Sequence, residues 1–246
     1  MTDARQNPWR LQIHEVVAST SDLCRTLAVA GEPDGLAVLA LRQSQARGSR
    51  GRDWAAPAGN LSLSVLLRPR ERARDAAQWS LLAGVAVTEA LAPYLPDPSA
   101  LRLKWPNDVL LHGGKLAGIL VDSAAGAGGE VDWLVIGIGV NLAVAPAMPG
   151  RVVACVADVA LPPPPRDFAV ALLARLHHWR EARARDGFAP VRAAWLDHAP
   201  AFGSHVTLRM GDRQLGGGFA GLGDDGGLLL DTDGRVQAFA TGEVLS

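Results

Sequence analysis

Residues 43–60 read Q-S-Q-A-R-G-S-R-G-R-D-W-A-A-P-A-G-N, and the rest of the chain is organised around them. The stretch holds three arginines, three glycines, Trp54 and no aliphatic residue larger than alanine, so it cannot build core. Glycines let the backbone approach a ligand closely, and arginine guanidinium groups donate paired hydrogen bonds to anions. The stretch therefore favours an anion site, such as one for phosphate or a nucleotide. A solvated surface loop is the alternative. Residues 61–67 alternate and then become fully apolar, which ties the loop to a buried strand.

Composition and charge restrict the class of protein. The chain has 246 residues, of which 48% are hydrophobic and 20% charged, and its formal net charge is -1. This predicts one large domain with a small second one, and no overall basic field for nucleic acid. Cys24 and Cys155 lie far apart without metal-ligand spacing, which favours a reducing cytoplasm over a disulfide framework. No run approaches the length of a membrane span, so we expect no membrane partner.

The hydrophobic pattern predicts a mixed α/β domain followed by a small β domain. Alternating or fully apolar runs predict strands, and 3.6-residue spacing with capping residues predicts helices. The expected strands cover residues 11–17, 36–41, 61–67, 101–108, 109–121 as a hairpin, and 131–141, and the expected helices cover 23–30, 76–91, 167–185 and 188–198. Short strands at 206–210, 214–219, 227–230 and 236–240 predict an all-β tail of SH3-like size. We therefore expect a catalytic domain at 1–199 and an SH3-like domain at 200–246.

A second informative stretch, L-R-L-K-W-P-N-D at residues 101–108, delivers polar groups from a strand. Asp108 follows Asn107, and such oxygen ligands suit Mg²⁺. Lys104 and, in the following hairpin, Lys115 add positive charge. Glycines interrupt the buried run V-D-W-L-V-I-G-I-G-V-N at residues 131–141, which indicates either a bulge or a close approach of a ligand.

The polar residues together suggest phosphate chemistry. Ser19 and Thr20 precede a helix and are explained by capping, although the same hydroxyls can face a ligand. With Gln43 they suit a ureido or amide-like group, and Trp54 offers a face for a flat base. The sequence shows no evident Ser-His-Asp or Cys-His set. An excess of cations over nucleophiles points to catalysis by positioning and charge neutralisation, as in a nucleotide-using transferase or ligase.

Three motifs in this order resemble biotin protein ligase: R-G-S-R-G-R-D-W with P-A-G-N-L-S-L-S-V-L-L-R-P, then K-W-P-N-D-V-L-L-H-G-G-K-L-A-G-I-L-V, then G-I-G-V-N-L. The resemblance covers nearly the whole chain. It implies an α+β fold, with a mixed-sheet catalytic domain like that of class II aminoacyl-tRNA synthetases and a C-terminal SH3-like domain. It also implies two reaction steps: biotin and MgATP form biotinyl-5'-adenylate, and a lysine of a biotin carboxyl carrier protein then takes the biotinyl group.

The resemblance further implies a role for each matching residue. The implied biotin-binding residues are Ser19, Thr20, Ser21, Gln43, Arg47, Gly48, Ser49, Lys115, Gly118, Gly137 and Gly139. The implied ATP-binding residues are Arg50, Arg52, Trp54, Lys104, Asn107, Asp108 and Asn141. Lys115, Arg50 and Asp108 are the implied catalytic residues, and Asp108 is also the expected Mg²⁺ ligand. The implied carrier belongs to acetyl-CoA carboxylase or another biotin-dependent carboxylase.

Two departures from the family pattern and two competing functions remain. Ser49 stands where the family commonly has an arginine that helps retain the adenylate, so we expect faster leakage of that intermediate. Ser21 replaces an asparagine that contacts biotin. Because the matched region begins at residue 11, we expect no DNA-binding domain and no repressor function, while a homodimer stays open. A lipoate or octanoate ligase of the same superfamily and a non-catalytic nucleotide-sensing module are the alternatives.

Overall fold

The computed structural model describes residues 8–48, 54–126, 128–148 and 150–245. The main elements of the larger domain are β1 (Arg10–Val17), α1 (Thr20–Val29), β2 (Leu36–Gln43), β3 (Leu61–Leu67), α2 (Gln78–Leu91), β4 (Leu101–Lys104), β5 (Asp108–Leu111), β6 (Gly114–Ala125), β7 (Val131–Val140), α3 (Pro165–Asp186) and α4 (Ala189–Leu196). The smaller domain contains β8 (His205–Met210), β9 (Arg213–Leu222), β10 (Leu228–Thr232), β11 (Arg235–Phe239) and β12 (Glu243–Val244). Within these described residues, no helix combines the length and apolar character needed to cross a bilayer.

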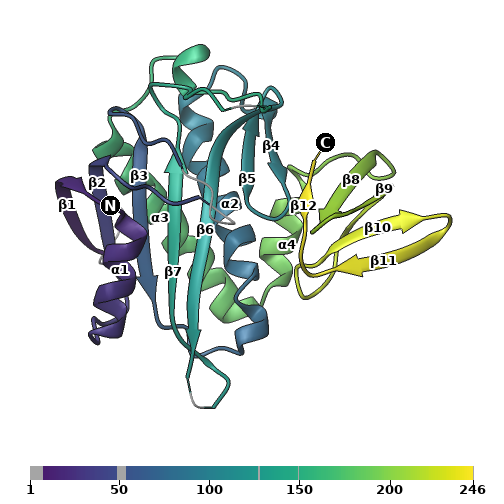
Figure 1. Cartoon of the computed structure of the whole chain (residues 1–246), viewed down its shortest axis with the longest axis horizontal. Coiled ribbons are helices and arrows are strands. Elements are labelled where there is room, and N and C mark those ends of the chain that lie inside the picture. The colour runs from purple at the N-terminus through teal and green to yellow at the C-terminus, as the bar shows by residue number, and fades with distance from the viewer. Residues whose placement is uncertain (1–7, 49–53, 127, 149, 246) are drawn as a thin grey trace, which may run out of the picture.

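A mixed sheet forms the middle layer of the larger domain (Figure 1). Its seven strands run in the order β1-β2-β3-β7-β6-β5-β4. β1 and β2 are parallel, and every other neighbouring pair is antiparallel. The central strand β7 pairs along most of its length with both β3 and β6, so its residues are inaccessible from either edge.

Helices cover the two faces of this sheet unequally. α2 and α3 lie behind the sheet in Figure 1 and bury the larger apolar core, which includes Ile136 and Ile138 of β7. The shorter helix α1 lies in front and covers a smaller core around Cys24 and Val135. Burial raises the pKa of the Cys24 thiol to about 12, as expected of an unreactive cysteine in the core. Because α1 covers only part of its face, the rest of that face is left for a pocket.

The register of the central strands creates a row of small residues on the α1 face. Ser62 of β3 pairs with Gly139 of β7, which pairs in turn with Gly118 of β6. One step along the same face, Ser64 pairs with Gly137. Side chains alternate across a strand with a period of two, so these positions all point toward α1. The apolar positions between them point into the larger core.

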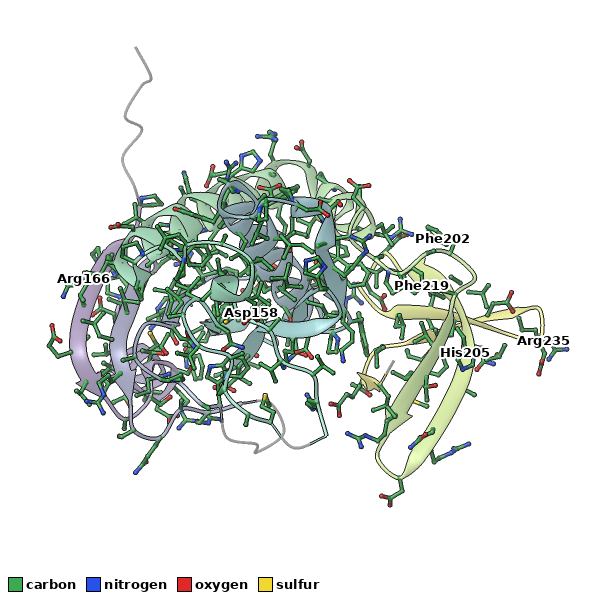
Figure 2. The ribbon with its side chains drawn as sticks, turned by 90° about the horizontal axis from the view of Figure 1, so that it is seen from above. Asp158, Arg166, Phe202, His205, Phe219 and Arg235 are labelled. Atoms are coloured by element: carbon green, nitrogen blue, oxygen red, sulfur yellow. The ribbon has the colours of Figure 1, made fainter. Side chains whose placement is uncertain are left out.

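The smaller domain has a five-stranded sheet of order β11-β10-β9-β8-β12 that packs against the helices of the larger domain. Trp195 of α4 faces Phe219 of β9 with 6.5 Å between ring centroids. Trp105 Nε1 donates a hydrogen bond of 3.1 Å to the Gly226 carbonyl. Figure 2 shows Phe219 on the side of the small sheet that lies next to the larger domain. The two domains therefore share one continuous apolar core.

The α+β class and its elements were predicted with small changes of boundary. The expected strand at residues 101–108 is divided: β4 ends at Lys104, a turn containing a cis Trp105–Pro106 peptide follows, and β5 begins at Asp108. The expected hairpin at 109–121 is confirmed, with His112 and Gly113 in the left-handed conformations that its turn requires. The two-residue strand β12 was not predicted, because it is too short to show a period.

Candidate functional site

A pocket opens on the α1 face of the sheet, where the row of small residues leaves space. The space inside it and in its open mouth amounts to about 620 Å³. The lining comprises Ser19, Thr20, Ser21, Gln43, Arg47, Gly48, Trp54, Ser62, Asn107, Lys115, Gly118, Ile119, Leu120, Gly137, Ile138, Gly139, Met148 and Arg151. Most of these residues were singled out in the sequence, and they come from α1, β2, β3, β6, β7 and the segments between elements.

Glycines on β7 form the floor of the pocket because side chains approach the backbone there. A Cβ atom built on Gly137 would lie 2.3 Å from the Ser21 hydroxyl oxygen, and one built on Gly139 would lie 2.5 Å from Trp54 Nε1. Such separations are far inside van der Waals contact. Side chains therefore approach both glycines closely, and the strand pairing is regular at Gly137 and Gly139, which excludes a bulge at these two positions.

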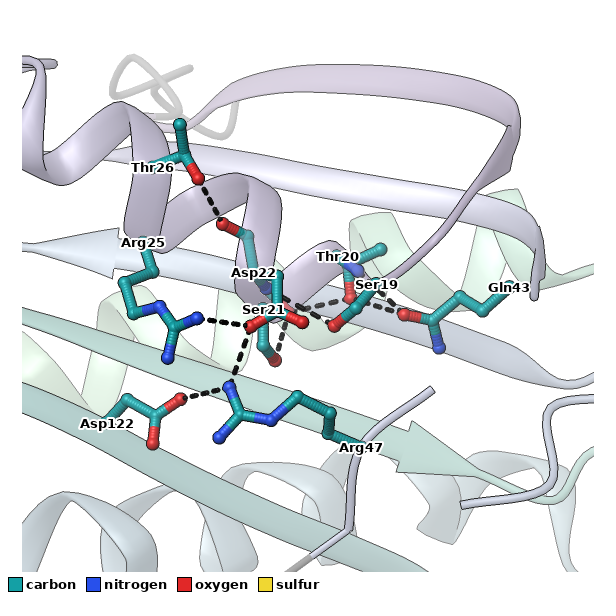
Figure 3. Close-up of polar contacts among 10 residues, drawn as sticks. Ser19, Thr20, Ser21, Asp22, Arg25, Thr26, Gln43, Arg47 and Asp122 are labelled. Carbon is teal, nitrogen blue, oxygen red and sulfur yellow. Dashed lines mark hydrogen bonds and ion pairs between the residues drawn. The ribbon is translucent and has the colours of Figure 1, made fainter. Parts of the chain in front are cut away.

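One wall of the pocket is a chain of hydrogen-bonded hydroxyls. Ser64 Oγ donates to Thr20 Oγ1 at 2.8 Å and lies 3.0 Å from Ser21 Oγ. The Thr20 amide and hydroxyl both donate to Gln43 Oε1, at 2.7 and 3.1 Å (Figure 3). Ser19 caps α1 by accepting from the Asp22 amide at 3.2 Å, and it also lines the pocket. The capping and ligand-facing interpretations of Ser19 are therefore compatible.

Arg47 lies at the rim, between two carboxylates. Its Nη1 donates to Asp22 Oδ1 at 2.8 Å and to Asp122 Oδ2 at 3.2 Å (Figure 3). Burial alone would lower the pKa of Arg47, but the hydrogen bond with Asp22 and the charges of Asp122 and Asp22 outweigh that effect and raise it. The guanidinium thus has acidic partners on both α1 and β6.

A buried charge cluster lies beside the pocket. Lys115 Nζ is 2.5 Å from Asp108 Oδ1, and Lys104 Nζ is 3.9 Å from Asp108 Oδ2. Burial lowers the pKa of Lys104; the Asp108 charge opposes this effect, while Arg151 and Lys115 reinforce it. Lys115 lines the pocket itself, whereas Asp108 and Lys104 lie behind it among the described residues.

Trp54 supplies the flat apolar surface of the pocket. Its ring packs on Gly118 and Gly139, and Lys115 Nζ lies 5.5 Å from the ring centroid, within the range of a cation–π contact. The Trp54 amide donates to the Ala46 carbonyl at 3.1 Å. This bond joins the two described ends of the arginine-rich stretch. Ser49, Arg50 and Arg52, which complete the expected site, lie outside the described residues.

Asn141 was expected to bind ATP, but its side chain points into the protein. It is 1% exposed, donates to the Ala154 carbonyl at 3.1 Å and accepts from Asn60 Nδ2 at 3.3 Å. Asn60 Oδ1 in turn accepts from the amides of Ala143 and Val144. The pair therefore fixes the segment after β7 rather than lining the pocket. Asn107, by contrast, lines the pocket while its amide donates to the Ile119 carbonyl at 2.7 Å.

Several lining residues were not predicted. Leu120 pairs with Gly137 on the pocket face, Ile119 and Ile138 line the pocket although they belong to the larger core, and Ser62 is the polar position of an alternating strand. Met148 and Arg151 come from an irregular segment without a motif. Arg151 forms an ion pair with Glu243 of β12, which also pairs with Arg209 of β8. The smaller domain thus contacts a residue of the pocket wall.

The expected Mg²⁺ ligand fits poorly with the geometry. Among the described residues, no three acidic, histidine or cysteine side chains gather as a metal set. Asp108 already lies between two ammonium groups, which repel a further cation. Mg²⁺ typically uses one or two protein carboxylates together with substrate phosphates and water. The described donor set therefore does not fit a magnesium ion held by the protein through Asp108.

Comparisons with known proteins agree with this geometry. A model of the biotin/lipoate A/B protein ligase family matches residues 13–141, and one of the biotin protein ligase C-terminal domain matches 201–245. A biotin–[acetyl-CoA-carboxylase] ligase of Paracoccus denitrificans is 39% identical over 213 residues, which cover 84% of this chain and 88% of that protein. A ligase of the same name from Mycobacterium tuberculosis is 34% identical over 244 residues, with coverage of 94% and 88%.

A solved structure gives the same result in three dimensions. The biotin protein ligase of Aquifex aeolicus in complex with biotin and ATP superimposes with a TM-score of 0.81 and 26% identity, over 95% of this chain and 97% of that one. The match includes both domains, and the sequence relatives are similar over most of their own length. From the pocket, the fold and these similarities together, we conclude that this chain belongs to the biotin protein ligase family.

Proposed function

We infer that this protein is an ATP-dependent ligase that attaches biotin to a lysine of a carrier protein. The single observation that carries the inference is the position of Lys115, whose ammonium lines a pocket that has neutral hydroxyls on one side and cations on the other. A neutral ring with hydrogen-bonding edges suits the hydroxyl side, and the charged carboxylate and phosphates suit the cationic side. The Aquifex protein, with the same fold, holds biotin and ATP.

In the first step, a biotin carboxylate oxygen attacks the α-phosphorus of ATP. The P–O bond to the β-phosphate breaks, and biotinyl-5'-adenylate and pyrophosphate form. Negative charge increases on the equatorial oxygens of that phosphorus, and the ammonium of Lys115 would neutralise it. Asp108 would hold Lys115 in place through the 2.5 Å contact, so its proposed role is to position this cation. The chemistry needs no nucleophile from the protein.

In the second step, the neutral amine of a carrier lysine attacks the acyl carbon of the adenylate. The bond between that carbon and the phosphate oxygen breaks, an amide forms, AMP leaves and the amine loses a proton. The deprotonated amine is needed for attack, and a free carboxylate near the pocket would be the group to accept its proton. Asp108 is the described carboxylate closest to Lys115, but it is paired, so we assign the proton to bulk solvent rather than to this residue.

The assigned roles follow position in the pocket. Ser19, Thr20, Ser21 and Gln43 would contact the biotin rings, with Gly137 providing the space they need. Trp54 would lie against adenine. Lys104 would act from behind the pocket as a source of positive potential, and Arg50 and Arg52 remain predictions from the sequence. We propose that Mg²⁺ enters with ATP, bound to its phosphates, as part of the substrate.

The proposed acceptor is the biotin carboxyl carrier protein of acetyl-CoA carboxylase, because two relatives are named for that substrate. The decisive experiment incubates the purified chain with a biotin carrier domain, MgATP and either biotin or lipoate, and measures the mass of the carrier. We expect biotinylation and no lipoylation. Lys115→Ala should lower the rate about 100-fold or more, the scale of an electrostatic contact that acts in the transition state. Full activity of this variant would favour the non-catalytic module instead.

A further inference from the structure

Arg47 is held by two acidic residues that the reaction itself does not require. Asp22 lies in the first turn of α1, and Asp122 lies in β6. Figure 3 shows the Arg47 guanidinium between the two carboxylates, and Arg25 approaches the same Asp22 oxygen, Oδ1, at 3.0 Å. One side chain therefore joins the start of the arginine-rich stretch to a helix and to a strand.

Neither carboxylate lines the pocket, but each lies next to a different wall of it. Asp22 directly follows the hydroxyl wall that ends with Ser21, and Asp122 lies two residues beyond Leu120, which lines the pocket on β6. Because Arg47 contacts both carboxylates and also lines the pocket, its side chain spans the rim from one wall to the other. We call this bridging side chain, with its two ion pairs, the strap.

A second contact holds the far side of the same stretch. The amide of Trp54 is bonded to the Ala46 carbonyl, and its indole rests on the glycines of β6 and β7. The described ends of the stretch are thus fixed by the Arg47 ion pairs and by the Trp54 contacts. Ala46, whose carbonyl accepts the Trp54 bond and which directly precedes Arg47, is buried.

The ion pairs of Arg47 are exposed enough to solvent to break and re-form readily. The side chain of Arg47 is 37% exposed, and those of Asp22 and Asp122 are 37% and 23% exposed. Ion pairs this accessible are individually weak and are screened by salt. They are strong enough to bias the position of one side chain, yet weak enough to break each time a ligand enters or leaves.

We propose that Asp22 and Asp122 are positioning residues that hold Arg47 across the pocket mouth and thereby slow the escape of bound biotin and its adenylate. The proposal rests on the proposed function, because it concerns the ligands of that reaction. Neither carboxylate touches the reacting atoms. Their effect is on the dissociation rate of the small molecule and not on the chemical step.

The test uses Asp122→Asn in the full chain, because an amide of equal size removes the charge from a strand position without altering a helix cap. The adenylate is formed from biotin and MgATP, and its dissociation is followed by rapid mixing with excess unlabelled ligand. We expect dissociation to be about threefold to tenfold faster, as an ion pair of ordinary strength implies. Asp122→Glu, which keeps the charge, should release the adenylate as slowly as the wild-type protein does. The rate of adenylate formation and the melting temperature should not change.

The dependence of adenylate dissociation on salt distinguishes loss of the ion pair from a general loss of stability. Dissociation from the wild-type protein should accelerate as ionic strength increases, and the acceleration should be much smaller in Asp122→Asn. Asp132→Asn is the matched control: Asp132 pairs with Arg68 at the other end of the sheet, away from the pocket. Asp22→Asn tests the second carboxylate, and comparison of its melting temperature with that of the wild type separates damage to α1 from loss of the strap.

Two outcomes overturn the proposal. The first is unchanged adenylate dissociation in both asparagine variants, and the second is an equal acceleration in Asp132→Asn. Failure of the proposed function would look different, because the wild-type protein would then form no adenylate and modify no carrier. An active wild-type enzyme with unaltered Asp22 and Asp122 variants would reject the strap and leave the ligase function intact.

Discussion

Lys115 Nζ lies 2.5 Å from Asp108 Oδ1, and both side chains are almost completely buried. The pair joins β5 to β6 beside the pocket, and Lys104 approaches the second carboxylate oxygen. One anion therefore holds two cations that would otherwise repel each other. The ammonium that we assign to the α-phosphate owes its position to this arrangement.

Replacement of Asp108 by asparagine should damage both stability and catalysis. Removal of one partner from a buried ion pair costs about 3–5 kcal/mol, because the remaining charge stays buried without compensation. We expect a loss of this order in chemical denaturation, together with a fall in the rate of adenylate formation. Asp186→Asn, which removes half of an exposed pair with Arg185, should change stability by less than about 0.5 kcal/mol. Equal effects of the two variants would contradict the buried role of Asp108.

A methyl group at Gly139 should displace the indole of Trp54. The new Cβ would lie 2.5 Å from Trp54 Nε1, which leaves the ring no room to stay. We expect Gly139→Ala to raise the KM for ATP about tenfold, the value of one lost stacking contact. Gly128→Ala serves as the control, because nothing lies within 4 Å of its Cβ position. A normal KM for ATP in Gly139→Ala would show that Trp54 does not bind the nucleotide.

Arg151 should contribute to nucleotide binding although no motif marks it. It lines the pocket, lies close enough to Lys104 to influence its pKa, and is held by Glu243. We expect Arg151→Ala to raise the KM for ATP about tenfold, as loss of one charged contact implies, with little change in the KM for biotin. Arg209→Ala removes another partner of Glu243, and Arg209 does not line the pocket. If both variants behaved alike, Arg151 would act through stability alone.

The lowered pKa of Lys104 predicts a dependence on pH. Burial favours the neutral amine, so this lysine loses its charge at a lower pH than the ordinary value of 10.5. Between the lowered and ordinary pKa values the unfolded chain binds more protons, so this group makes stability rise with pH. Over the same interval the pocket loses positive potential, and the KM for ATP should increase. Lys104→Arg should flatten that increase, and an unchanged pH profile would argue against a role for Lys104.

Ser49 should affect how fast the protein releases biotinyl-adenylate. It stands where the family commonly has an arginine, and it lies outside the described residues. We expect Ser49→Arg to slow the release of biotinyl-adenylate, because a cation near the phosphate would hold the intermediate. Single-turnover measurements with trapped product would detect the change. Retention that is equal in the two proteins would count against the prediction.

The sequence was enough to predict features that depend on residues close together in the chain, such as the strands and helices. Glycines within the buried run of β7 indicated a bulge or a close approach, whereas the turn that divides residues 101–108 was not predicted. The partners of Arg47 could not be predicted, since Asp22 and Asp122 belong to other elements and neither has a distinctive neighbourhood. The same holds for Arg151 and Glu243, which meet only because the smaller domain docks where it does.

Asn141 shows a different limit. A polar residue at the end of a glycine-rich strand suggests a ligand, but the sequence cannot tell which way its side chain points. Its amide is used to fix the segment after β7, together with Asn60 from another loop. Two asparagines that lie far apart in the chain form one structural unit, and only their contacts reveal it.

The contact between Trp195 and Phe219 affects how the protein loses its structure on heating. Because one core runs through both domains, separation of the last strands from the rest would expose aromatic surface on each side. The protein should therefore melt in a single calorimetric transition, with a van't Hoff enthalpy equal to the measured one. A chain that ends before β8 should aggregate rather than survive as a smaller ligase, so any fusion partner is better attached at a terminus than inserted at the domain boundary.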